Sequence, residues 1–321
     1  MAGKAKLLIT RKLSENTERR AAETYDVVLN PGDKLYSPAE LLAKCRDMDA
    51  VLPCHSEIFS ADIVDQLPKS IRIIANHSVG VDHCDLAALA AKGVVVTNTP
   101  DVLSDATAEI AMLLLLGAAR RASEGDQMVR SGNWAHWSPS FMVGAQVTGK
   151  RIGIVGMGRV GQVMARRARG FDMEVHYHNR TRLAPEDEQG AIYHDSLDEL
   201  LGVSQYLSLH CPATPDTIGF LNAERIALLP DGAIVVNTAR GNLIDEAALI
   251  AALRSGKIAA AGLDVFVDEP GGNPGYAPLT NIFMLPHIGS ATFETRDAMG
   301  YRALDNLDVF FAGGEPGDRV A

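Results

Sequence analysis

The sequence predicts an α/β protein with two doubly wound domains, and three observations support this. The chain has 321 residues, more than one compact core usually serves, so two domains are expected. Short apolar runs alternate with helical stretches, as in parallel sheets covered by helices. One apolar run leads directly into a glycine-rich turn and then a helix, as in nucleotide-binding folds.

The first series of elements lies in the N-terminal part of the chain. Helices are predicted over PAELLAKCRD and SADIVDQL, and a long helix is predicted from Ser104 to Arg130. Five apolar runs are predicted to be buried strands: KLLIT, DVVLN, AVLP, IRIIANHSV and VVVTN.

A second series begins at Lys150. Its six predicted strands are RIGIVG, EVHYH, YLSLHC, AIVVNT, AAGLDV and IFMLPH. The predicted helices between them are VGQVMARRARG, SLDELLGV, AERIALL and DEAALIAALRSG. Six strands with right-handed crossovers make a nucleotide-binding domain. The tail 292–311 is predicted to be helical and to return to the first domain, because it has no strand partner nearby.

Composition excludes several classes of partner. The formal charge of -10, from 40 acidic and 30 basic residues, repels nucleic acid and anionic membranes. No apolar run approaches the ~20 residues of a membrane span, and the start MAGKAKLLITRKL lacks a signal-peptide pattern. The cysteines suggest neither a disulfide framework nor a zinc site, so a reducing cytoplasm and no metal are expected. The four are scattered: Cys45, Cys54, Cys84 and Cys211.

The glycine-rich turn has the spacing of a dinucleotide-binding loop. Gly156 permits a tight turn, Gly158 lets backbone amides approach a pyrophosphate, and Gly161 lets helix and strand pack closely. Arg159 and Val160, between the last two glycines, belong to the same expected cofactor site. A glycine-rich turn alone is weak evidence, but the strand before it and the helix after it favour dinucleotide binding.

The end of the next predicted strand indicates which dinucleotide is bound. NAD sites usually carry an acid there, about 20 residues beyond the loop, to bind the ribose 2′-hydroxyl. This chain has Asn179, followed by Arg180, Thr181 and Arg182. Two arginines and a hydroxyl would bind a 2′-phosphate through charge-assisted hydrogen bonds. NADP(H) is therefore predicted, with NAD(H) the weaker alternative; the competing interpretation is a solvated basic turn.

Three polar residues at or near strand ends suggest a catalytic set. Arg240 suits the binding of a substrate carboxylate and the polarisation of a carbonyl, because a guanidinium is bidentate and stays charged. His287 suits proton donation near neutral pH, and Glu269 suits its orientation. Taken singly, each could be structural: an interdomain ion pair, a loop acid or a buried histidine.

The chain resembles the D-isomer-specific 2-hydroxyacid dehydrogenases over nearly its whole length. The segments that carry this resemblance are NHSVGVDHCD, NTPDVLSDATAE, GIVGMGRVGQ, NTARGNLIDE, AGLDVFVDEP and LPHIGSAT. NTPDVLSDATAEIAMLLLL and GNWAHWSP look most like the glyoxylate/hydroxypyruvate reductases. The resemblance implies a Rossmann cofactor domain, residues 100–287, inserted in a flavodoxin-like substrate domain, residues 1–99 and 288–321.

The resemblance also implies roles for individual residues. Arg240, Glu269 and His287 match the family's catalytic set. Ser78, Val79 and Gly80 match its loop for the substrate carboxylate. The remaining matches are cofactor contacts: Cys211, Pro212, Thr238, Ala239, Asp264, His287 and Gly289. The implied reaction is the NADPH-dependent reduction of glyoxylate or hydroxypyruvate to glycolate or D-glycerate.

The loop 133–137 contains two tryptophans, Trp134 and Trp137. Large aromatics in an exposed connection need burial, and a subunit interface would provide it. A homodimer is therefore expected, with Trp137 reaching the partner's substrate site as the resemblance implies. The alternative is local packing beneath the loop.

Two other functions stay open at this stage. One is a related dehydrogenase that acts on a bulkier 2-keto acid, phosphite or formate. The other is a dinucleotide-sensing interaction protein, which would need a peptide-binding surface and usually extra tails. This compact chain has neither obvious tails nor a missing catalytic residue.

Overall fold

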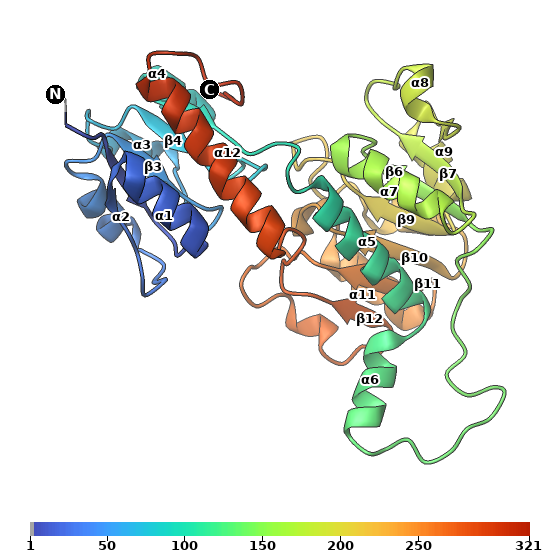
Figure 1. The fold of residues 1–321 in the computed structure, drawn as a ribbon. Coiled ribbons are helices and arrows are strands. Elements are labelled where there is room, and N and C mark those ends of the chain that lie inside the picture. Colours follow the sequence, from blue (N-terminus) through green and yellow to red (C-terminus); the bar gives the residue numbers. More distant parts are fainter. Residues whose placement is uncertain (1–2) are drawn as a thin grey trace. The chain divides into compact units, whose positions relative to one another are not determined.

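The computed structural model describes residues 3–321 and forms two compact units (Figure 1). One unit comprises the residues up to Leu103 together with Ala291–Ala321, and the other comprises Ser104–Ser290. The sequence places the two boundaries after residues 99 and 287, a few residues before the observed ones. Within the described residues, no helix has both the length and the apolar character needed to cross a bilayer.

The first unit contains a parallel five-stranded sheet in the order β2-β1-β3-β4-β5, the flavodoxin-like order. All five predicted strands are present: β1 Lys6–Ile9, β2 Asp26–Val28, β3 Ala50–Leu52, β4 Ile73–Ala75 and β5 Val95–Thr97. The helices of this unit are α1 Glu15–Thr24, α2 Pro38–Cys45, α3 Ala61–Gln66, α4 Leu86–Ala91 and α12 Phe293–Phe311.

Alternation along the strands explains the helix layers on both faces of this sheet. Leu7 and Ile9 pack with α1 and α12, whereas Leu8 between them packs with α2, α3 and α4. Leu304 and Leu307 of α12 are buried in the first of these layers. The C-terminal helix therefore belongs to the first unit, as its sequence predicted (Figure 1).

The second unit contains a parallel seven-stranded sheet in the order β12-β11-β10-β9-β6-β7-β8. Its strands are β6 Arg151–Val155, β7 Glu174–His178, β8 Ile192–Tyr193, β9 Tyr206–Leu209, β10 Ala233–Asn237, β11 Ile258–Leu263 and β12 Ile282–Met284. The prediction of six strands missed β8, because two residues at a sheet edge carry too little periodicity to be recognised.

Helices cover both faces of this sheet as well. Its helical elements are α5 Ser104–Ala119, α6 Ala122–Arg130, α7 Arg159–Arg169, α8 Pro185–Glu188, α9 Leu197–Val203, α10 Ala223–Leu228, α11 Glu246–Ser255 and the short 3₁₀ turns η1 Gly241–Leu243 and η2 Pro274–Tyr276. From β6 the chain runs to β7 and β8 on one side, and then to β9 on the other side. Ligands of open parallel sheets bind at the carboxyl edge of such a switch point.

The prediction of one helix from Ser104 to Arg130 is wrong. The helix breaks into α5 and α6 at Arg121, whose φ of 55° is left-handed. The carbonyl of Ala119, at the end of α5, accepts a hydrogen bond of 2.8 Å from the amide of Ala145. Arg121 then pairs with Glu124 at 2.7 Å in the first turn of α6. The partner of the last turn of α5 lies in a distant loop, so local periodicity does not reveal the break.

Candidate active site

Glycine is favoured for a different structural reason at each of the three positions in the turn after β6. Gly156 has a φ of 94°, and a Cβ there would lie 2.5 Å from the amide nitrogen of Cys211. A Cβ at Gly161 would lie 2.2 Å from the carbonyl oxygen of Gly156, so α7 could not pack closely on β6. At Gly158 a Cβ would meet nothing within 4 Å. The open space at Gly158, at the start of α7, would let a pyrophosphate approach the backbone. The close packing at Gly156 and Gly161 holds the turn and helix behind it.

Asn179 holds the end of β7 against this turn. Its Oδ1 accepts a hydrogen bond of 2.6 Å from the amide of Met157. The amide of Gly156 also donates to the carbonyl of His178 at 3.1 Å. Arg180 and Thr181 follow directly and are exposed. The loop expected to select the cofactor is therefore attached to the loop expected to bind the pyrophosphate.

Arg182 differs from Arg180 in its surroundings. Its Nε and NH2 atoms donate to the two carboxylate oxygens of Glu188, at 2.6 and 3.1 Å. Its guanidinium also lies over the ring of Tyr193, 5.3 Å from the centroid. No hydrogen bond or ion pair joins the Arg180 side chain to the residues that the structure describes. Sequence reasoning missed Glu188, because the chain must turn back between residues 182 and 188 before Glu188 can contact Arg182.

Loops after β9 and β10 continue the same edge. The amide of His210 donates to the carbonyl of Val155 at 2.8 Å, and Cys211 and Pro212 follow. Burial raises the pKa of the Cys211 thiol to about 11, so the thiol is neutral at neutral pH. Thr238 lies at the end of β10 and is buried. The turn from Cys211 to Pro212 therefore offers a cofactor backbone atoms and a neutral side chain, with no added charge.

Asn237 shapes the turn that carries Arg240, and the sequence analysis did not single it out. It is fully buried, and its Oδ1 accepts from the amide of Ala239 at 3.0 Å. Its Nδ2 donates to the carbonyl of Arg240 at 2.8 Å. The Arg240 NH1 atom donates to the Ala239 carbonyl at 2.8 Å. The buried Asn237 side chain therefore fixes the backbone position from which the Arg240 side chain extends.

Asp264, directly after β11, anchors the turn after β12. It is 1% exposed, and its two oxygens accept from the amides of Ile288 and Gly289 at 2.8 and 2.7 Å. Burial raises the pKa of this carboxyl, and the two amide hydrogen bonds oppose that shift. A Cβ at Gly289 would lie 3.1 Å from the carboxylate, which favours glycine there. Asp264 thus positions the residue just before these amides, His287.

His287 and Glu269 form a carboxylate–imidazole pair. Nδ1 of His287 lies 2.5 Å from Oε2 of Glu269, and both side chains are about a quarter to a third exposed. The other oxygen of Glu269 accepts from the amide of Phe266 at 2.7 Å. Because the carboxylate engages Nδ1, the Nε2 atom is the one suited to exchange a proton with a substrate.

In the first unit, the segment of Ser78, Val79 and Gly80 follows β4 at the carboxyl edge. The Ser78 hydroxyl donates to the carbonyl of Gly80 at 2.7 Å, and the Asn98 side chain donates to the carbonyl of Val79 at 2.9 Å. These two hydrogen bonds fix the backbone carbonyls of Val79 and Gly80. Within the described chain, none of the three backbone amides donates a hydrogen bond, so they are suited to bind an anion.

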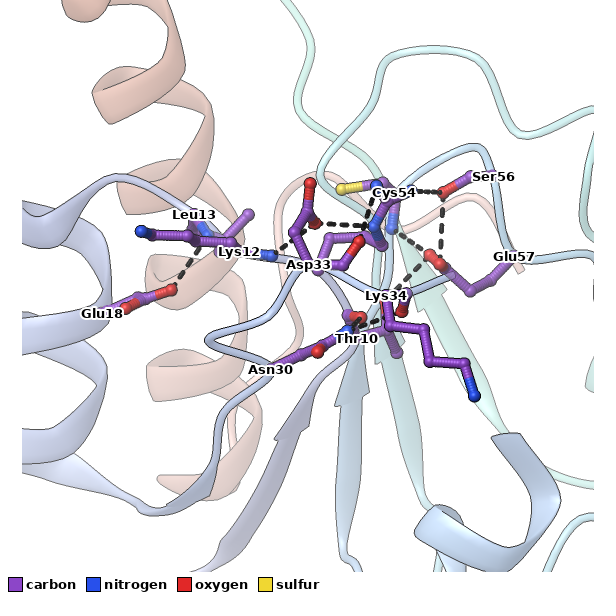
Figure 2. Close-up of polar contacts among 11 residues, drawn as sticks. Thr10, Lys12, Leu13, Glu18, Asn30, Asp33, Lys34, Cys54, Ser56 and Glu57 are labelled. Carbon is purple, nitrogen blue, oxygen red and sulfur yellow. Dashed lines mark hydrogen bonds and ion pairs between the residues drawn. The ribbon is translucent and has the colours of Figure 1, made fainter. Parts of the chain in front are cut away.

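A buried acid organises the neighbouring loop after β3, as Figure 2 shows. Glu57 is 2% exposed and accepts from the Thr10 hydroxyl at 2.8 Å and the Cys54 amide at 3.0 Å. The Ser56 hydroxyl donates to its other oxygen at 3.1 Å. Pro53, in this loop, accepts from the amide of His77 at 2.8 Å. Sequence reasoning missed Glu57, because its partner Thr10 follows β1 and lies far from it in the chain.

Trp134 and Trp137 lie between α6 and β6 in a segment without regular structure. They are 56% and 75% exposed. Within this chain, the alternative of local packing beneath the loop therefore does not hold for either ring.

The second unit thus combines a dinucleotide-type glycine turn, a basic loop and an imidazole–carboxylate pair on the carboxyl edge of one sheet. This combination defines a nicotinamide-dependent oxidoreductase of the Rossmann type. Residues 112–289 match the family described as "D-isomer specific 2-hydroxyacid dehydrogenase, NAD binding domain".

Full-length similarity identifies the family of the whole chain. Glycerate dehydrogenase of Hyphomicrobium methylovorum is 46% identical over 97% of this chain and 98% of its own length. Glyoxylate reductase of Pyrococcus furiosus is 43% identical over 98% and 94%. An NADPH-dependent glyoxylate/hydroxypyruvate reductase of Sinorhizobium meliloti, solved with NADP and malonate, superposes with a TM-score of 0.88 at 33% identity, covering 99% and 97%. The chain belongs to the D-isomer-specific 2-hydroxyacid dehydrogenase family, which confirms the resemblance seen in its sequence.

Proposed function

We propose that this chain reduces glyoxylate and hydroxypyruvate to glycolate and D-glycerate with NADPH. The observation that carries the proposal is the 2.5 Å pair of His287 and Glu269, on the same sheet edge as the glycine turn. The names of the relatives, glycerate dehydrogenase and glyoxylate reductase, support substrates of this size.

When bound, NADPH would supply a hydride to the carbonyl carbon of the substrate. His287 donates the proton from Nε2 to the carbonyl oxygen, so a hydroxyl forms and the imidazole is left neutral. Glu269 holds Nδ1 and stabilises the protonated ring before transfer. In the oxidative direction the same Nε2 atom accepts the hydroxyl proton.

The substrate carboxylate needs positive charge and hydrogen-bond donors. Arg240 provides a guanidinium that binds carboxylate and polarises the adjacent carbonyl. The amides of Ser78, Val79 and Gly80 provide neutral donors for a carboxylate oxygen, which their lack of partners in the described chain supports.

Several residues of this chain fit a bound dinucleotide. Gly156, Gly158 and Gly161, with Arg159 and Val160, would surround the pyrophosphate at the start of α7. Arg180 and Thr181 would bind the 2′-phosphate, since no acid stands at the end of β7 to repel it. The NADP bound to the Sinorhizobium reductase supports this preference. We propose the remaining cofactor contacts as well, with Asp264 at the nicotinamide carboxamide: Cys211, Pro212, Thr238, Ala239, Asp264, His287 and Gly289.

The exposed tryptophans support a homodimer in which Trp137 contributes to the partner's substrate site.

A cavity of about 380 Å³ opens beside α5 and α6, lined by Gly117, Arg121, Gly144 and Phe283. It lies beside Asn281, at the amino end of β12, and therefore away from the catalytic edge.

Steady-state assays test the proposal. Glyoxylate, hydroxypyruvate, pyruvate and a bulkier 2-keto acid are each offered with NADPH and with NADH. We expect the highest kcat/KM with NADPH and one of the two small acids named above. Faster reduction of the bulkier acid, or no turnover of any of them, would contradict the proposed function.

A further inference from the structure

We infer that Tyr177, Arg182 and Glu188 form a brace that holds the segment 179–184 in its cofactor-binding conformation, and that Arg180 alone presents a guanidinium to the 2′-phosphate. The inference rests on the proposed use of NADPH. It gives Arg182 a different role from the one its sequence suggests, because Arg182 then acts as a positioning residue.

The ion pair at the centre of the brace is bidentate. Arg182 donates from Nε and NH2 to both oxygens of Glu188, at 2.6 and 3.1 Å. The Glu188 side chain is only 10% exposed. Hydrogen bonds from Arg182 and then from Tyr177 lower the pKa of this carboxyl to about 2, so Glu188 is ionised at neutral pH. The charge of Arg182 is therefore already compensated within the loop.

Tyr177 connects this pair to the sheet. Its ring is fully buried on β7, and its hydroxyl donates to Oε1 of Glu188 at 2.7 Å. The same hydroxyl accepts from the amide of Leu183 at 3.1 Å. One phenol thus joins strand β7, the segment that follows it and the end of α8. Because the Arg182 guanidinium also lies over Tyr193 of β8, the segment is held on both sides.

Arg180 differs from Arg182 in its partners. Both arginines are exposed, but the described residues give the Arg180 side chain no hydrogen bond or ion pair. It directly follows Asn179, whose Oδ1 accepts from Met157 of the glycine turn at 2.6 Å. The uncompensated charge of the segment is therefore the one that lies next to the turn expected to bind the pyrophosphate.

The charge-neutralising substitution Glu188→Gln distinguishes the two possible roles of Arg182, because they predict opposite changes in NADPH binding. If Arg182 were a phosphate ligand restrained by Glu188, removing the carboxylate charge would release it and strengthen NADPH binding. If the pair is a brace, the segment loosens and NADPH binding weakens. We expect the ratio of kcat/KM for NADPH to that for NADH to fall by about three- to tenfold, as expected for a weakened charge-assisted hydrogen bond.

A matched control removes the same charge without touching the brace. Glu186 is exposed in α8, two residues from Glu188, and no hydrogen bond or ion pair is recorded for it in the described chain. Glu186→Gln should leave the cofactor ratio unchanged or raise it slightly. Tyr177→Phe keeps the buried ring but removes the hydroxyl, and should lower the ratio in the same direction as Glu188→Gln.

Hydrogen exchange of the ligand-free protein provides a readout that needs no turnover. Amides of the segment 179–189 should exchange faster in Glu188→Gln and Tyr177→Phe than in wild type or Glu186→Gln. A higher NADPH-to-NADH ratio in Glu188→Gln, or unchanged exchange, would overturn the brace alone. A wild type that prefers NADH would instead overturn the proposed cofactor, and with it the presentation of Arg180 to a phosphate.

Discussion

Nδ1 of His287 lies 2.5 Å from Oε2 of Glu269, and the backbone of His287 is left-handed, with a φ of 54°. A residue with a Cβ adopts this region only at a cost, of order 1 kcal/mol or more. The two amides that follow, those of Ile288 and Gly289, are held by buried Asp264, which fixes the turn. The imidazole is therefore oriented from both sides, through its ring and through its backbone.

His287→Ala should lower kcat by about 10²–10⁴, the usual contribution of a positioned general acid. NADPH affinity should be nearly unchanged, because the glycine turn and Arg180 remain. Single-turnover rates and a fluorescence titration of NADPH check the two expectations. A turnover number within a few-fold of wild type would exclude His287 as the proton donor.

Glu269→Gln keeps the shape of the side chain but removes the negative charge that stabilises protonated imidazole. Reduction requires the protonated ring, so the alkaline limb of its rate profile should move to lower pH. Oxidation requires the neutral ring, and its acidic limb should move in the same direction. Profiles are compared where a deuteride isotope effect shows that hydride transfer limits the rate. Superimposable profiles would mean that Glu269 does not tune the ring.

Arg180→Ala combined with Asn179→Asp should raise the KM for NADPH and improve the use of NADH. Aspartate retains an oxygen for the amide of Met157, so the turn should be kept while a 2′-phosphate is repelled. Initial rates with both cofactors measure the change, and wild type is the reference. If wild type already uses NADH better at equal concentration, the argument from the basic loop is wrong.

Trp137→Ala should change the ratio of rates with glyoxylate and hydroxypyruvate while NADPH affinity stays nearly constant. The indole is 75% exposed in one chain, so its effect would have to come through a partner subunit. Sedimentation at assay concentrations provides the control. An active monomer would remove this role for Trp137.

The stability lost in Glu188→Gln should depend on pH. The pKa of Glu188 is lowered from 4.5 to about 2 in the folded chain, chiefly by Arg182. Its contribution is therefore complete above pH 4.5 and declines as the pH falls toward 2. Urea unfolding should show a larger difference from wild type at neutral pH than below pH 4.5. A constant difference would mean that the charge of Glu188 does not stabilise the fold.

Local sequence accounts for much of the fold and of the site. Strands such as β6 and β10 are continuous apolar runs, and Gly156, Gly158 and Gly161 lie at fixed spacing between a strand and a helix. Arg240, Glu269 and His287 could be selected because they occur at or near strand ends, which meet on one edge of a parallel sheet. These features depend on neighbours close in the chain, so a single sequence contains the information.

Other features depend on contacts between segments far apart in the chain, and only the tertiary structure decided them. The break between α5 and α6 depends on Ala145, and the turn of His287 depends on Asp264. The compensation of Arg182 by Glu188 requires the intervening turn to fold back, whereas the described residues give Arg180 no such partner. Two arginines in one basic tripeptide look alike in the sequence. Their roles differ because a hydrogen bond or ion pair forms only where the fold brings both partners within reach.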